Sequence, residues 1–219
     1  MGKTLNKLKS TDPLRRVSHR GKVMTDNTNT QYEVPTWNQI YAMLFCQGKK
    51  IQAHDYKPDI IVGIARGGIV PARILSDLIE TKDFTTIQIE HYQGIKQTKE
   101  QPLLKQCLNM LLTDKEVLLV DDVSDRGTSL QLAKNHLKQN EAKEIKIATL
   151  YAKPTSTIIP DYYEKQTSNW IVFPWDIKET IRKIIEKHQD KSAIEKEITK
   201  LVKAGMPKQL TKEILGNMQ

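Results

Sequence analysis

Residues 117–129 read Val-Leu-Leu-Val-Asp-Asp-Val-Ser-Asp-Arg-Gly-Thr-Ser, so that four apolar residues run directly into two carboxylates and a short turn rich in hydroxyl groups. An apolar run this short, bounded by a turn, is typical of a buried parallel strand. If a helix begins near Thr128, the backbone N–H groups of the turn lie at its positive end, where a phosphate would be held. The stretch therefore predicts an open α/β sheet with a ligand site at the carboxyl ends of its strands.

A second segment of the same kind spans residues 60–71 and reads Ile-Ile-Val-Gly-Ile-Ala-Arg-Gly-Gly-Ile-Val-Pro. It predicts another strand, a glycine turn and the start of a helix. Gly67 and Gly68 permit backbone conformations and close approaches that a side chain would forbid. Arg66 adds a permanently charged fork that matches a phosphate.

These two segments resemble the phosphoribosyl pyrophosphate (PRPP) signature and the pyrophosphate-binding loop of type I phosphoribosyltransferases. Arg126 departs from the pattern, because the family usually carries threonine there. The resemblance implies that Asp121 and Asp122 hold the ribose hydroxyls, directly or through Mg²⁺, and that Asp125 moves a proton at purine N7. It also implies that the 5′-phosphate is gripped by Asp125, Arg126, Gly127, Thr128 and Ser129, and the pyrophosphate by Arg66 and Gly67.

A third set of segments, at residues 151–154, 161–163 and 170–176, indicates the base. Ala-Lys-Pro, Asp-Tyr, Trp-Ile and Pro-Trp-Asp at this spacing look like the bacterial xanthine-guanine phosphoribosyltransferases, a resemblance that covers residues 36 to 178. It implies that Lys153 donates to the 6-oxo group, that Trp170 stacks on the ring, and that the Ile171 carbonyl faces the 2-position. A lysine ammonium group donates a hydrogen bond to a carbonyl oxygen but cannot accept one from an amino group, so 6-oxopurines should be preferred to adenine.

Plainer roles are open for three of these residues. Trp170 could fill the core, and Lys153 could be a solvated lysine at a strand end. Asp176 either caps the following helix or, by the resemblance, approaches the metal and pyrophosphate as a third Mg²⁺ ligand beside Asp121 and Asp122.

Composition narrows the class of protein. The chain of 219 residues has a net charge of +8, and no apolar run approaches a membrane span or a signal peptide, so we expect no membrane partner and a cytoplasmic protein. The two cysteines and five histidines show no spacing typical of a metal site. The basic residues lack an aromatic-basic RNA-binding motif, so a nucleic-acid partner is unlikely, and the positive field would attract the polyanion PRPP.

The chain is expected to have three parts: a polar, disordered extension at 1–33, a phosphoribosyltransferase domain at 34–189 and a helical extension at 190–219. Thr36 and Gln39 form a capping-box pattern for a helix through about Cys46. Strands near 59–64, 85–90, 117–121 and 145–151 alternate with helices near 69–79 and 128–139, which predicts a parallel sheet flanked by helices. The segment after this core would form a small hood.

Two further segments lie outside this alternation. The polar stretch between Tyr92 and Leu108 is either a mobile loop, from which Lys96, Lys99 or Lys105 reaches pyrophosphate, or a surface hairpin. Two amphipathic helices, at 191–203 and 207–215, follow the core, and Ile194, Ile198, Leu201 and Val202 share one stripe. These helices are expected to pack on the core or on a second subunit.

The sequence thus predicts an Mg²⁺-dependent purine phosphoribosyltransferase of purine salvage, a homodimer or homotetramer, that converts PRPP and guanine, xanthine or hypoxanthine to a nucleoside monophosphate and pyrophosphate. Two alternatives are open. One is a PRPP-sensing regulator that binds nucleic acid and performs no chemistry. The other is a phosphoribosyltransferase for a different base.

Overall fold

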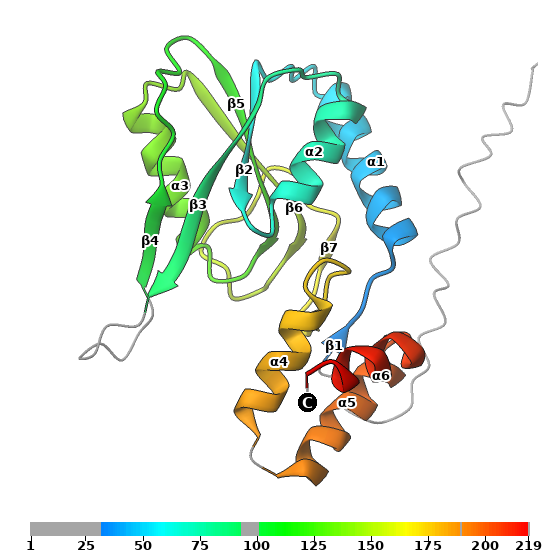
Figure 1. Ribbon diagram of the computed structural model, residues 1–219. Coiled ribbons are helices and arrows are strands. Elements are labelled where there is room, and N and C mark those ends of the chain that lie inside the picture. Colours follow the sequence, from blue (N-terminus) through cyan, green and yellow to red (C-terminus); the bar gives the residue numbers. More distant parts are fainter. Residues whose placement is uncertain (1–31, 93–100, 189, 219) are drawn as a thin grey trace, which may run out of the picture. The chain divides into compact units, whose positions relative to one another are not determined.

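The computed structural model describes residues 32–92, 101–188 and 190–218. Of the N-terminal extension expected at 1–33, residues 1–31 lie outside the described residues. Six strands form one sheet in the order β4-β3-β2-β5-β6-β7 (Figure 1). Every neighbouring pair is parallel except β3 and β4. The strands are β2 (Ile60–Ala65), β3 (Phe84–Tyr92), β4 (Gln101–Gln106), β5 (Glu116–Ser124), β6 (Glu144–Ala152) and β7 (Lys165–Gln166).

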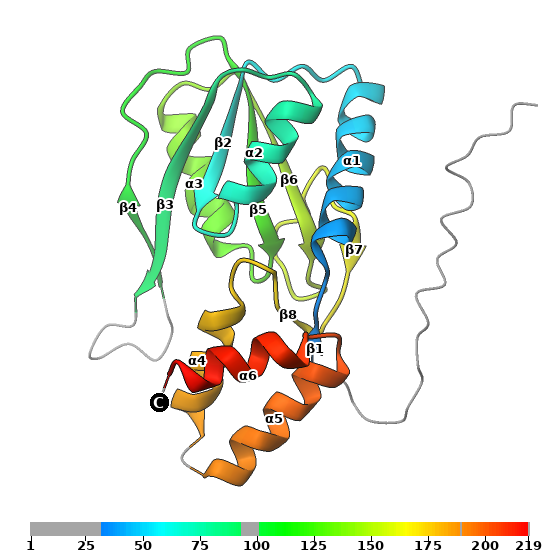
Figure 2. The same cartoon turned by 45° about the vertical axis from the view of Figure 1, so that its right-hand side comes forward.

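Helices cover both faces of this sheet, as the predicted fold class requires. Helices α1 (Trp37–Ala53) and α2 (Ile69–Leu78) lie on one face, and α3 (Thr128–Gln139) lies on the other (Figures 1 and 2). Leu118 and Val120 of β5 pack in the cluster that contains α1 and α2, whereas Val117 and Leu119 pack in the cluster that contains α3. Alternate side chains of one buried strand therefore fill two separate cores.

Helix α1 begins as predicted but ends later. Gln39 N donates to Thr36 Oγ1 at 3.3 Å and Thr36 N donates to Gln39 Oε1 at 2.8 Å, which completes the capping box. The helix continues past Cys46 to Ala53 because its second half is also buried. There the side chain of Gln47 donates to the carbonyl of Thr149 in β6 at 2.9 Å.

The segment between Tyr92 and Leu108 is partly a hairpin. Gln101–Gln106 forms β4 and pairs antiparallel with β3, so of the two alternatives the surface hairpin is confirmed for these six residues. Lys105 pairs with Glu90 at 3.3 Å on the same hairpin. Lys96 and Lys99 lie outside the described residues.

The C-terminal helices pack beside the residues that precede α1. Strands β1 (Tyr32–Glu33) and β8 (Trp170–Ile171) form a parallel pair, so the boundary expected after residue 33 differs from the structure. Helix α5 (Lys191–Lys203) has the predicted bounds, and α4 (Ile177–Lys187) and α6 (Lys208–Gly216) flank it (Figure 2). Helices α4 and α5 share an apolar cluster with Tyr32 of β1 and with residues next to β1, β8 and α6; its members are Tyr32, Val34, Val172, Ile177, Ile184, Ile194, Ile198, Leu201 and Met206. No helix of the described residues combines the length and the apolar character needed to cross a bilayer.

Gly127 gives the first testable prediction. Its φ of +81° lies in the left-handed region, and a Cβ there would come within 2.8 Å of Ile158 N. We expect Gly127→Ala to lower the free energy of unfolding by about 1–3 kcal/mol, since backbone strain and crowding add. Urea denaturation measures the change in the free energy of unfolding. Gly216→Ala is the matched control, because nothing lies within 4 Å of its Cβ position. Equal losses in both variants would contradict the conclusion that backbone conformation and crowding require glycine at position 127.

Candidate active site

The two paired acids lie inside strand β5, beside the glycine turn that follows β2. Strands β2 and β5 are neighbours, with Gly63 opposite Val120, so their carboxyl ends meet at one edge. A Cβ on Gly67 would come within 2.2 Å of Asp122 Oδ2, and one on Gly68 within 2.3 Å of Val120 O. The glycine turn is therefore in contact with the carboxylate.

Burial raises the pKa of both acids. The pKa of Asp122 is raised to about 6, and that of Asp121 is raised by burial and by the neighbouring Asp122. Asp122 N donates a local hydrogen bond to Asp121 Oδ1 at 2.9 Å. Two buried carboxylates side by side are stabilised in the ionised form by cations or hydroxyl groups of a ligand.

The predicted phosphate loop follows at the N-terminus of α3. Thr157 Oγ1 donates to Arg126 O at 2.9 Å, and Lys153 N donates to Ser124 O at 2.8 Å. The segment after β6 is therefore hydrogen-bonded to the phosphate loop. Asp125, Arg126 and Thr128 are exposed and accessible to a ligand. His91 of β3 adds a contact that the sequence did not predict, since its Nε2 lies 3.0 Å from Ser129 Oγ.

Arg66, the predicted pyrophosphate ligand, forms an ion pair with Glu179 of α4. Glu179 also accepts from Lys183 Nζ at 2.8 Å. The hydrogen bond from Lys183, and then that from Arg66, hold the pKa of Glu179 below its usual range. One carboxylate thus links two cations at the edge of the acidic site.

The predicted base-binding residues lie together near the end of β6. Lys153 Nζ donates to the carbonyl of Asn169, the residue before β8, and burial lowers the pKa of this lysine. The Trp170 side chain is 55% exposed, so the reading of Trp170 as a core residue is wrong. Ile171 is 7% exposed and packs into the core from the same short strand. The indole ring is therefore accessible for stacking.

Asp176 precedes α4 but makes no side-chain cap bond, so the capping role is wrong. Its Oδ1 atom is buried without a hydrogen-bond partner among the described residues. Burial, followed by the charges of Asp122 and Glu179, raises the pKa of Asp176 to about 7. An unpaired buried carboxylate oxygen is suited to a cation.

The carboxylates described above are suited to a magnesium ion whose remaining ligands would be water and substrate. Within the described ranges no group of three or more His, Cys, Asp or Glu side chains converges on one point. Mg²⁺ commonly binds one or two carboxylates, several waters and substrate phosphates, so a complete protein cage is not required. Asp121, Asp122 and Asp176 are the side chains that would hold it.

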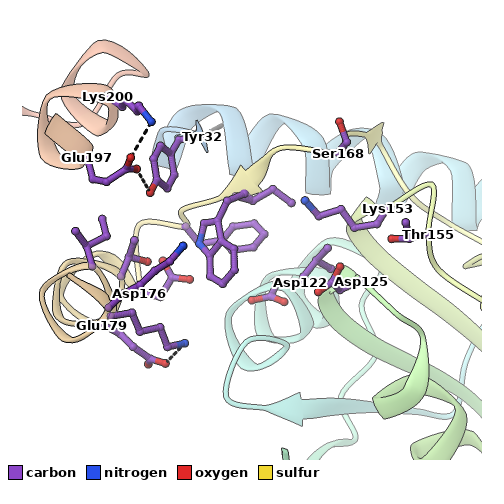
Figure 3. A pocket seen from close by; sticks show the side chains of 18 of the residues that line it. Tyr32, Asp122, Asp125, Lys153, Thr155, Ser168, Asp176, Glu179, Glu197 and Lys200 are labelled. Carbon is purple, nitrogen blue, oxygen red and sulfur yellow. Dashed lines mark hydrogen bonds and ion pairs between the residues drawn. The ribbon is translucent and has the colours of Figure 1, made fainter. Parts of the chain in front are cut away.

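A cavity of about 800 Å³ connects the acids with the base-binding residues (Figure 3). Asp122, Asp125, Lys153, Trp170, Ile171 and Asp176 all line it, whereas Arg66, Gly67, Asp121 and residues 126–129 do not. The structure thus brings three of the four predicted acids and the predicted base ligands into one pocket. Most of the other lining residues were not predicted from the sequence, and among them are the charged or hydroxyl-bearing side chains of Tyr32, Glu179, Lys183, Glu197 and Lys200.

Comparisons with known proteins agree with this geometry. Residues 45–182 match the family described as the phosphoribosyl transferase domain. A xanthine-guanine phosphoribosyltransferase from Nitratidesulfovibrio vulgaris is 31% identical over 144 residues, which cover 64% of this chain and 82% of the relative. One from Cereibacter sphaeroides is 32% identical over 119 residues, covering 53% and 68%.

A solved structure agrees as well. The purine phosphoribosyltransferase from Pyrococcus horikoshii Ot3 superposes with a TM-score of 0.61 and 39% identity, covering 66% of this chain and 93% of that one. The matches support the predicted fold class and enzyme class. The family match covers well over half of the chain and includes both predicted ligand loops, and the chain therefore belongs to the phosphoribosyltransferase family.

Proposed function

We propose that the protein transfers the 5-phosphoribosyl group of PRPP to a 6-oxopurine, giving a nucleoside monophosphate and pyrophosphate. The observation that carries the proposal is the shared pocket, which Asp122 and Asp125 line together with Lys153, Trp170 and Ile171, the residues proposed to bind the base. The relatives named above, described as purine or xanthine-guanine phosphoribosyltransferases, support the choice of base.

Binding places the two substrates along the edge of the sheet. The turn after β5 holds the 5′-phosphate at the N-terminus of α3, and Arg66 with the backbone at Gly67 holds the pyrophosphate. Lys153 donates to the 6-oxo group, and Trp170 stacks on the ring. An amino group at position 6 would place donor against donor, so adenine is disfavoured.

The reaction exchanges one bond at the anomeric carbon for another. The bond to the pyrophosphate oxygen breaks, positive charge develops on the ribose ring, and the bond from purine N9 forms. Asp121 and Asp122 stabilise that charge and orient the ribose hydroxyls. Asp125 moves a proton at purine N7 as N9 bonds to carbon. When bound, Mg²⁺ would neutralise the charge of the leaving pyrophosphate.

The proposed enzyme acts in purine salvage in the cytoplasm. It is a homodimer or homotetramer and binds PRPP, the purine and Mg²⁺. Sedimentation analysis of the purified chain measures its assembly.

The first experiment is a turnover assay with PRPP, Mg²⁺ and a panel of guanine, xanthine, hypoxanthine, adenine, uracil and orotate. We expect nucleotide formation with 6-oxopurines alone, and Lys153→Gln should lower their kcat/KM by about 10-fold or more because a charged hydrogen bond is lost. PRPP binding without turnover on any base would instead support the PRPP-sensing regulator. Turnover on adenine or a pyrimidine would support a phosphoribosyltransferase for a different base.

Asp125→Asn separates chemistry from binding. Removing the proton-transfer group should lower kcat by about 10²- to 10⁴-fold, with a much smaller change in the dissociation constant of PRPP. Steady-state kinetics and equilibrium titration with PRPP measure the two quantities. Asp114→Asn, an exposed carboxylate before β5, is the control. Equal losses of turnover and PRPP affinity in the Asp125 variant would refute its role.

The raised pKa of Asp176 predicts a pH dependence of stability. Its ordinary pKa is 3.8 and its folded pKa is about 7, so between these values the unfolded state binds fewer protons. The free energy of unfolding should therefore fall as pH rises from about 4 to 7. Asp176→Asn should flatten this slope in urea titrations without Mg²⁺. Asp55→Asn removes an exposed carboxylate and serves as control; an unchanged slope in the Asp176 variant would contradict the prediction.

A further inference from the structure

The first turn of α3 presents a side-chain hydroxyl group at the proposed 5′-phosphate site. Helix α3 begins at Thr128, so Ser129 lies in its first turn. Gly127 precedes the helix and has no side chain with which to cap it. The first N–H groups of α3 and the Ser129 hydroxyl group therefore lie together at the positive end of the helix, where an anion is stabilised.

Strand β3 brings a histidine to this turn. Strand β3 is parallel to β2, and β2 is parallel to β5, so all three strands end at the edge where the loop after β5 lies. Ile87 and Ile89 of β3 pack in the apolar cluster that contains Leu130 and Ala133 of α3. His91 follows Ile89 at the same spacing of two residues, so its side chain lies on the face of the sheet that α3 covers.

The histidine contacts the hydroxyl group directly. His91 Nε2 lies 3.0 Å from Ser129 Oγ, which is hydrogen-bond distance. Both side chains are accessible, since His91 is exposed and Ser129 is only partly buried. The contact joins the end of β3 to the phosphate loop, although the two residues are 38 positions apart in the sequence.

The direction of this hydrogen bond decides what Ser129 can offer to a phosphate. A serine hydroxyl group has one proton and two lone pairs, so it can accept one hydrogen bond and donate another. If His91 Nε2 donates to Ser129 Oγ, the serine proton can point at a phosphate oxygen. If the serine donates to the ring instead, its proton is used within the protein. Only the first arrangement provides the phosphate with a donor from Ser129, and each hydrogen bond of such a chain strengthens the other.

We propose that His91 is a positioning residue of the 5′-phosphate site, which donates from Nε2 to Ser129 Oγ and so directs the serine proton at the phosphate. The imidazole carries a proton on Nε2 in one neutral tautomer and in the imidazolium form, so both can do this. The inference rests on that part of the proposed function which binds the 5′-phosphate of PRPP at the turn after β5. It does not depend on which base is the acceptor.

The test measures dissociation constants by isothermal titration calorimetry of the full chain. PRPP and ribose 5-phosphate both carry the 5′-phosphate, whereas inorganic pyrophosphate does not. His91→Phe keeps a ring and removes the donor. The dissociation constants of PRPP and ribose 5-phosphate should therefore rise about 10-fold, and that of pyrophosphate should stay at the wild-type value. A general disturbance of the sheet edge would weaken all three ligands.

A conservative variant and a matched control accompany this measurement. His91→Gln retains an N–H donor at the end of its side chain, so it should keep most of the affinity that His91→Phe loses. His54→Phe changes another exposed histidine, whose ring packs against Tyr162 instead, and should leave all three dissociation constants unchanged. Melting temperatures identify a variant that folds poorly. If His91→Phe does so, His91→Ala replaces it, since an exposed side chain can be truncated without leaving a cavity.

A double-mutant cycle tests whether His91 acts through Ser129. Ser129→Ala should weaken PRPP binding about 10-fold by itself. Adding His91→Phe should weaken it no further, because the histidine then has no hydroxyl group to orient. Losses that multiply in the double variant would show that the two residues act independently, and would overturn the inference.

The outcomes separate the two proposals. Wild-type affinity for PRPP in His91→Phe, or an equal loss of pyrophosphate affinity, overturns the role of His91 and leaves the proposed function intact. A wild-type chain that binds PRPP but turns over no 6-oxopurine overturns the proposed function and leaves the role of His91 standing. A wild-type chain that binds neither PRPP nor ribose 5-phosphate overturns both.

Discussion

The contact between the Gly67 backbone and the Asp122 carboxylate is the constraint on which the site depends. A Cβ at position 67 would overlap the carboxylate, so with any other residue there the Asp122 side chain would have to leave its position beside the turn. Because β2 and β5 are adjacent parallel strands, this contact brings the turn that carries Arg66 against the acids. The loop proposed to bind pyrophosphate and the acids proposed to bind the ribose therefore lie side by side.

The central part of this arrangement could be predicted from the sequence because its signals are local. Buried parallel strands are continuous apolar runs, and helices α2 and α3 begin directly after glycine turns. The capping box of Thr36 and Gln39 likewise lies within four residues. The acids, the two loops and Lys153 with Trp170 follow from these elements, and the structure places Asp122, Asp125, Lys153 and Trp170 around one cavity.

The remaining parts depend on contacts between distant segments, which leave no local pattern. Strand β1 has only two residues and exists because it pairs with β8, far along the chain. The extra length of α1 comes from burial of Gln47 against β6, and a glutamine gives no apolar signal. Asp176 has the sequence position of a cap, yet its carboxylate lies among the acids of β5. Glu179, Tyr32 and Glu197 were missed for the same reason.

The bridge from Arg66 through Glu179 to Lys183 has a consequence for product release. Arg66 has an internal counter-ion, so pyrophosphate binding at Arg66, as proposed, would exchange one anionic partner for another. The affinity for pyrophosphate would then be the difference between two ion pairs of similar kind, and Glu179 would stay paired with Lys183, near enough to pair with Arg66 again. An enzyme with such a replaceable counter-ion binds its polyanionic product less tightly, and less tight binding shortens the residence of pyrophosphate after each turnover.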